Sequence, residues 1–158
     1  MLPASLPAQD ILLRLLLAAA LGALLGTERE LRRKSAGFRT NILIALGSAL
    51  FTILSVGIEG DAPADPTRIA AQIVTGIGFL GAGAIMRTDS GVHGLTTAAT
   101  IWVNAALGMA AGAGRYQVAI LGGFVTLAVL FVLAPIEHVL ERNAREREAE
   151  RRATDRPT

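Results

Sequence analysis

The chain has 158 residues, of which 52% are apolar and 18% are charged, and it contains no cysteine. Without cysteine the protein has no disulfides, thiolate metal ligands or cysteine nucleophiles. The mean hydropathy is +0.50, and a soluble domain with this value would have little polar surface to keep it in solution. The composition therefore excludes a disulfide-stabilised scaffold and favours one compact membrane domain.

Five apolar segments follow one another along the chain, and each is close to the length of a transmembrane helix. A hydrocarbon core of about 30 Å requires about 20 helical residues. The predicted spans are 7–26, 40–58, 69–86, 95–111 and 116–136. No basic residue precedes the first span, which is therefore predicted to be a retained helix and not a cleaved signal. We expect an all-α, polytopic membrane protein with five transmembrane helices, formed by a domain over residues 1–136 and a charged cytoplasmic tail over 137–158.

The basic residues lie on alternate sides of the predicted spans. With the N-terminus outside, twelve of the fifteen Lys and Arg residues are cytoplasmic, two are outside and Arg14 lies within a span. The positive-inside rule then predicts an outside N-terminus and a cytoplasmic C-terminus. The same charges favour contact with anionic lipid headgroups. Because the charges sort by loop and form no patch, we expect no nucleic-acid partner, although the pI is near 9.9.

Small residues mark the faces where the predicted helices contact one another, because membrane helices associate through close packing of small side chains. In the first span they recur every four positions, at Ala18, Gly22 and Gly26. The third span contains four glycines within eight positions, which are Gly76, Gly78, Gly81 and Gly83. Two readings of these four glycines stay open: close packing of helix backbones, or a broken helix whose free carbonyls line a cavity.

A polar stripe follows the fourth span. Thr96, Thr100 and Asn104 share one helix face at a spacing of four residues. A threonine in a membrane helix usually hydrogen-bonds to its own backbone, whereas the Asn104 amide needs a partner on another helix. Arg14 in the first span also has two readings: an inward side chain that binds an anion or carboxylate, or a helix-end anchor that pairs with Asp10.

Oxygen ligands for a metal ion are few. Near the spans they are Glu28, Asn41, Gln72, Thr75 and Asn104. A single carboxylate makes a weak magnesium site, so Mg²⁺ is a candidate ligand without an assigned site, and no resident cofactor is expected. The sequence also offers no Ser/His/Asp or paired-carboxylate grouping in a plausible pocket. We therefore do not expect an enzyme.

Two long stretches resemble a known family. Residues 22–54 and 68–116 contain the words GTERE, AGFRTN, RIAAQ, GIGFLGAGAIMR and GLTTAATIW. These words resemble the membrane domain of the bacterial MgtC/SapB family. The resemblance implies a multi-pass protein of the bacterial inner membrane that is linked to magnesium-limited growth and virulence. It also implies regulation of other membrane proteins, such as the rotary ATP synthase or a transporter.

The resemblance carries functional candidates onto this chain residue by residue. They are Glu28, Arg29, Arg39, Arg68, Gln72, Arg87 and Thr96. Glu28, Arg29 and Arg39 flank a short cytoplasmic loop, and we expect them to form an ion-pair network there with Arg87. Longer family members have a soluble domain after the last helix, where this chain has the charged tail.

Two functions from different classes remain as hypotheses. The first is a non-enzymatic membrane protein that regulates other membrane proteins. The second is a small ion or solute transporter with a pathway along the third and fourth helices, although no carboxylate lies at the centre of a predicted span. A homo-oligomer, with a dimer favoured, is compatible with both.

Overall fold

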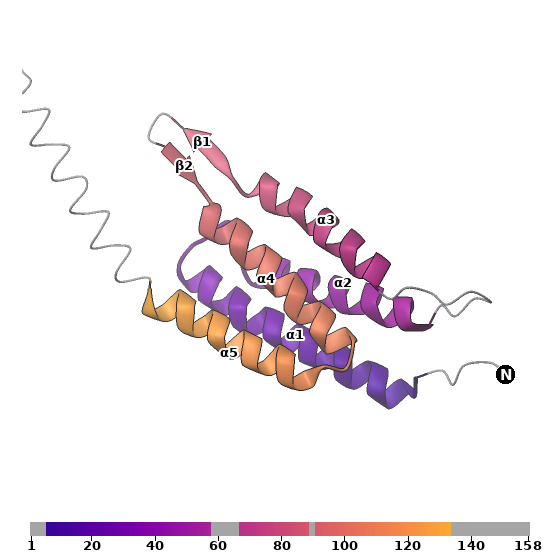
Figure 1. Cartoon of the computed structure of the whole chain (residues 1–158). Coiled ribbons are helices and arrows are strands. Elements are labelled where there is room, and N and C mark those ends of the chain that lie inside the picture. The colour runs from indigo at the N-terminus through magenta and orange to yellow at the C-terminus, as the bar shows by residue number, and fades with distance from the viewer. Residues whose placement is uncertain (1–5, 58–66, 89–90, 134–158) are drawn as a thin grey trace, which may run out of the picture. The chain divides into compact units, whose positions relative to one another are not determined.

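The computed structural model describes residues 6–57, 67–88 and 91–133. These residues form five helices and a two-stranded sheet (Figure 1). In chain order the elements are α1 (Ala8–Leu31), α2 (Phe38–Gly57), α3 (Thr67–Gly83), β1 (Met86–Thr88), β2 (Gly91–His93), α4 (Leu95–Gly112) and α5 (Tyr116–Val132). The predicted charged tail over 137–158 lies outside the described residues.

Each of the five predicted spans overlaps one helix, and the predicted ends at 58 and at 134–136 lie outside the described residues. Three of the described helical segments, Ala8–Leu31, Phe38–Ser55 and Leu95–Gly112, are long and apolar enough to cross a membrane. The helices α3 and α5 are also apolar but shorter, with 17 residues each. The chain divides into two compact units, Met1–Gly123 and Phe124–Thr158. The first unit contains α1 to α4, the sheet and the beginning of α5.

The structure corrects the expectation of a purely helical fold. The predicted third span ends too late, because α3 ends at Gly83 and Met86 begins β1. After Gly83 the backbone tightens into a turn, in which the amide of Ile85 donates to the carbonyl of Ala82 at 3.1 Å. The two strands pair antiparallel beyond the ends of α3 and α4 (Figure 1). Gly94, with a φ of 91°, then turns the chain into α4, a conformation that other residues rarely adopt.

The predicted first span also ends too early. Helix α1 continues from Gly26 through the word GTERE to Leu31. Inside this extension the Thr27 hydroxyl donates to the carbonyl of Ala23 at 2.7 Å, which satisfies it within its own helix. The added turn brings Glu28 and Arg29 into the buried part of the first unit. The polar end of α1 is therefore packed against other helices.

Glycines determine how closely α2 approaches its two neighbours. A Cβ on Gly22 of α1 would lie 2.6 Å from the carbonyl oxygen of Asn41, and one on Gly26 would lie 2.8 Å from Cα of Phe38. On the other side, a Cβ on Gly112 of α4 would lie 2.6 Å from the carbonyl oxygen of Ala49. The backbones of α1 and α4 therefore both contact the backbone of α2, as small-residue packing in membranes allows.

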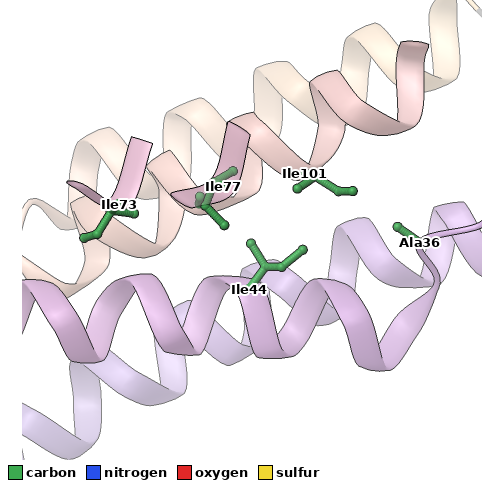
Figure 2. Close-up of a cluster of buried hydrophobic side chains, with 6 residues drawn as sticks. Ala36, Ile44, Ile73, Ile77 and Ile101 are labelled. Carbon is green, nitrogen blue, oxygen red and sulfur yellow. The ribbon is translucent and has the colours of Figure 1, made fainter. Parts of the chain in front are cut away.

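A cluster of apolar side chains joins α2, α3 and α4. Ile44 of α2 points toward Ile73 and Ile77 of α3 and toward Ile101 of α4 (Figure 2). Ala36, in the loop before α2, completes the cluster at one end. These are aliphatic residues without a polar atom in the side chain, so they can pack densely without an unsatisfied group. The cluster positions α3 against α2 and α4.

The structure rules out one of the two readings of the α3 glycines, the broken helix. The helix is continuous from Thr67 to Gly83, so it is not broken. A Cβ on Gly76, Gly78 or Gly83 would meet nothing within 4 Å, and one on Gly81 would make only ordinary contact with Ala98. Most of the α3 glycines therefore have no close neighbour among the described residues.

Candidate functional site

The buried polar side chains of the described residues define the candidate site. They are Glu28, Arg29, Asn41, Ser48, Thr97, Thr100 and Asn104. Burial of a polar group is costly unless it is hydrogen-bonded, and burial of a charge is more so unless it is paired. The hydrogen bonds and ion pairs of these side chains therefore show which of them connect parts of the protein.

The first group, which we call the arginine cluster, consists of Glu28, Arg29 and Arg32 at the end of α1 and Thr97 at the start of α4. The Glu28 carboxylate pairs with Arg29 at 3.5 Å and also with Arg32, one helical turn later. Nη2 of Arg29 donates to the Thr97 hydroxyl at 3.2 Å. One carboxylate thus balances part of the charge of two guanidinium groups. Cations at this C-terminal end of α1 are also favoured by the helix dipole.

The second group, the asparagine pair, consists of Asn41 of α2 and Asn104 of α4, both with no exposed surface. Nδ2 of Asn41 donates to the carbonyls of Ala36 and Gly37, at 2.8 and 2.9 Å, and so closes the turn that precedes α2. Nδ2 of Asn104 donates to the carbonyl of Asn41 at 2.7 Å and to its Oδ1 at 3.1 Å. The expected interhelical bond of Asn104 is therefore made to α2.

Arg14 binds the end of a helix. Its Nη1 donates to the carbonyl of Gly112 at 2.7 Å, at the C-terminus of α4. The guanidinium lies next to Gly114, whose φ of 71° turns the chain toward α5. Cationic side chains stabilise the unpaired carbonyls at a helix C-terminus. The side chain thus points inward, as one reading predicted, but its partner is a backbone carbonyl and neither an anion nor Asp10.

Glu30 has a structural role that the sequence did not indicate. Its carboxylate accepts a hydrogen bond from the amide of Phe38 at 3.0 Å. Phe38 is the first residue of α2, whose first amides have no partner within the helix. A cap from eight residues earlier matches no local capping motif, so only the loop geometry reveals it. This contact connects the end of α1 to the start of α2.

The structure buries half of the predicted site residues. The buried ones are Glu28, Arg29, Asn41, Thr100 and Asn104, whereas Arg39, Arg68, Gln72, Arg87 and Thr96 are exposed. Of the predicted ion-pair network, the described residues contain the pair between Glu28 and Arg29, but Arg39 and Arg87 do not join it. Arg32 takes part instead.

The predicted polar stripe of α4 is displaced by one residue at its beginning. Thr97 is buried and Thr96 is exposed, while Thr100 and Asn104 are buried as expected. A spacing of exactly four residues drifts around a helix with about 3.6 residues per turn, so a buried face includes steps of three. The Thr100 hydroxyl donates to the carbonyl of Thr96 at 2.8 Å and is satisfied within α4.

The predicted oxygen ligands of a metal ion are spread over four helices. The described part of the chain has no group of three or more His, Asp or Glu side chains that could hold a metal ion. Glu28, the buried carboxylate, already pairs with two arginines. Magnesium requires several oxygen ligands in near-octahedral geometry, and Gln72 is exposed on another helix. The predicted oxygen ligands are therefore not assembled around one point.

The fold and the buried groups define an apolar helical protein whose helices are connected by a few polar side chains. A model of the MgtC family matches residues 15–139. The chain belongs to the MgtC family.

The chain is similar to several relatives that are considerably longer. It is 49% identical over 129 residues to a protein of Escherichia coli (strain K12) named "putative magnesium transporter YhiD", which covers 78% of this chain and 60% of that protein. It is 48% identical over 132 residues to protein MgtC of Brucella abortus (strain 2308), covering 84% of this chain and 55% of the relative. With protein MgtC of Salmonella paratyphi A the identity is 44% over 141 residues, covering 89% and 60%. The chain thus aligns with 55 to 60% of the length of these relatives. No solved structure matches it.

Proposed function

We propose that this protein is a non-enzymatic regulator in the bacterial inner membrane that serves magnesium homeostasis by contacting other membrane proteins. The observation that carries the proposal is the state of the buried polar groups. In the described residues, the Glu28 carboxylate pairs with two arginines, and Asn104 binds the backbone and side chain of Asn41. Groups that conduct an ion must exchange partners with it, whereas Glu28 is paired at the end of its own helix and Asn104 connects α4 to α2.

The magnesium link is supported by the relatives. Proteins named MgtC are 44 to 48% identical to this chain, and the E. coli relative carries magnesium transport in its name. The residues that the family model matches, 15–139, include most of the helical part of this chain. The resemblance of the words GTERE and GLTTAATIW to the MgtC/SapB family adds the link to virulence.

The proposed contact surface is the apolar exterior. Large side chains such as Phe51, Phe79 and Trp102 are more than half exposed, which is compatible with lipid or with another membrane protein. Candidate partners are the rotary ATP synthase, a transporter and a second copy of this chain. In this arrangement five helices span the membrane, with the N-terminus outside and the C-terminus in the cytoplasm.

Transport is the second candidate function, and one structural observation favours it. A groove between α2 and α3 contains three polar side chains, Thr40, Ser48 and Gln72, among apolar residues. A polar group inside a membrane span often marks the path of a solute. The name of the E. coli relative points in the same direction.

Flux through the purified full-length protein in proteoliposomes distinguishes the two functions. We expect magnesium entry, followed with an internal Mg²⁺-sensitive dye, to equal that of empty vesicles, with an ionophore as positive control. Circular dichroism of the same vesicles shows whether the protein is helical. Flux that exceeds empty vesicles and falls in a Gln72→Leu variant, but not in a Thr96→Val variant, would make the protein a transporter and overturn the regulatory proposal.

A further inference from the structure

The groove between α2 and α3 is the feature of the structure that the proposed function does not explain. Its volume is about 620 Å³, and it extends along α2 from Thr40 to Phe51 and along α3 from Ile69 to Leu80. Ile44, Ile73 and Ile77, which belong to the apolar cluster, also line it (Figure 2). We call it the α2–α3 groove.

Glycines line both sides of the α2–α3 groove without a neighbour. Gly47 of α2 and Gly76 of α3 are among its lining residues, and a Cβ on either would meet nothing within 4 Å. Glycine destabilises a helix relative to alanine. At Gly22 and Gly112 close packing offsets this cost, because a helix backbone lies directly against them. A flexible lipid chain needs no glycine for contact, whereas Gly47 and Gly76 leave room for the close approach of another helix backbone.

Polar side chains in the same groove lack a partner among the described residues, and Ser48 and Gln72 are the two that lie along its length. Ser48 is 3% exposed and Gln72 is exposed on α3, and neither side chain hydrogen-bonds to another of the described residues. The hydroxyls of Thr52 and Thr75, in contrast, each donate to a carbonyl of their own helix, at 2.7 and 3.0 Å. An unsatisfied amide or hydroxyl is costly where no water is present. The groove therefore needs an occupant that offers hydrogen bonds, which lipid chains do not.

We propose that a second copy of this chain occupies the groove and that the two α3 helices pack against each other around Gln72 and Gly76. A two-fold axis along the membrane normal brings the same residue of both copies together. A carboxamide has two donors and an acceptor, so two Gln72 side chains can satisfy one another. Any other helix would need a matching polar residue, which a second copy always carries.

The exposed face of α3 also carries a large side chain that can fill the α2–α3 groove of a second copy. Phe79 is 80% exposed, the highest value among the large apolar side chains of the described residues. It lies about one helical turn from Gly76, so the Phe79 of one copy can enter the space beside Gly76 and Gly47 of the other. This interface depends on the proposed membrane insertion but not on the regulatory role, and flux measurements do not test it.

Disulfide crosslinking tests the interface in native membranes, because the natural chain has no cysteine. Leu80 lines the groove and is 50% exposed, whereas Trp102 of α4 is 52% exposed and does not line it. We expect the full-length Leu80→Cys protein to form a covalent dimer under mild oxidation and the Trp102→Cys protein to stay monomeric. Equal crosslinking at both positions, crosslinking at Trp102 alone, or none at either would overturn the proposal.

Two glycine substitutions in the Leu80→Cys background test the close approach. Gly76→Ile places a large side chain in the groove and is expected to lower the crosslinked fraction by about tenfold, since small residues permit the contact. Gly78→Ile is the matched control, because Gly78 has the same open surroundings but does not line the groove. It should leave crosslinking unchanged. Equal effects of the two substitutions, or no effect of Gly76→Ile, would contradict the proposed interface.

Gln72→Leu removes the proposed amide pair while it keeps an apolar surface. We expect a loss of about threefold in dimer affinity, the size typical of interhelical hydrogen bonds in membranes. Dimer fraction at several protein-to-lipid ratios measures it, and circular dichroism confirms that each variant is folded. A wild-type monomer that retains phospholipid in native mass spectrometry, or a crosslink from Leu80→Cys to a different protein, would assign the groove to that occupant instead.

Discussion

At the scale of single residues, Glu28 is the acidic side chain that is buried among the described residues, with 2% of its surface exposed. It pairs with Arg29, which is equally buried, and with Arg32. A buried guanidinium without its carboxylate is more costly than the pair is favourable, because its desolvation remains when the attraction is lost. Glu28 therefore matters chiefly as the counter-charge that allows Arg29 to contact Thr97 of α4.

A Glu28→Gln substitution is expected to lower the free energy of unfolding by about 3 kcal/mol, the cost of breaking a buried ion pair. Thermal unfolding of the detergent-solubilised protein, followed by its helical circular dichroism, measures the loss. The control is Glu30→Gln: the new amide oxygen still accepts from the Phe38 amide, so the change should stay within about 0.5 kcal/mol. Adding Arg29→Met to Glu28→Gln should recover part of the loss, since it removes the unpaired charge. Equal losses in Glu28→Gln and Glu30→Gln would contradict this account.

Contacts of single residues show what the sequence could and could not predict. The need of Asn104 for a partner on another helix follows from its amide chemistry alone, and the structure supplies Asn41. That Asn41 would be this partner does not follow, because the contact depends on the approach of α4 to α2 at Gly108 and Gly112. The cap from Glu30 to Phe38 was missed for the same reason, since it depends on the path of the loop between α1 and α2.

At the scale of helices, α2 is the element that α1 and α4 both approach closely. The five helices could be predicted because long apolar segments are a strong signal. The ends of α1 and α3 were predicted wrongly, because Glu and Arg residues continue α1 beyond its apolar part and because two strands of three residues each have little sequence signal. Glycine spacing located the contact face of α1, but it could not distinguish Gly112, which touches α2, from Gly78, which touches nothing.

This difference between glycines leads to a prediction about packing. In Gly112→Val the new Cβ would lie 2.6 Å from the carbonyl oxygen of Ala49, so α4 must move away from α2. We expect a loss of about 1 to 3 kcal/mol, as for other overpacked cores, measured by the same thermal unfolding. Gly78→Val is the matched control on α3, where the added side chain meets open space, and its expected effect is below about 0.5 kcal/mol. A similar loss in both variants would show that valine itself, and not the contact with α2, causes the effect.

At the scale of the whole molecule, the polar contacts indicate which ends of the helices lie on the same side of the membrane. The bond between Arg29 and Thr97 joins the end of α1 to the start of α4, so the loop at 32–37 and the hairpin at 86–93 share one side. This side carries Arg32, Arg33 and Lys34 in the first loop and Arg87 in the hairpin. The bond between Arg14 and the carbonyl of Gly112 joins the opposite ends of the same helices. The structure thus groups these basic loops, and the positive-inside rule predicts that their side is the cytoplasmic one.

Single cysteines in the otherwise cysteine-free chain test this orientation directly. Ser35, in the basic loop, and Ala113, in the turn after α4, are both exposed. In intact cells we expect a membrane-impermeant maleimide to label Ala113→Cys and to label Ser35→Cys only after the inner membrane is permeabilised. Labelling of both in denaturant controls for intrinsic reactivity. The reverse pattern would place the N-terminus in the cytoplasm and leave the arginine cluster facing outside, where the positive-inside rule disfavours it. Labelling of both sites in intact cells would show that the two ends of α4 do not lie on opposite sides of the membrane.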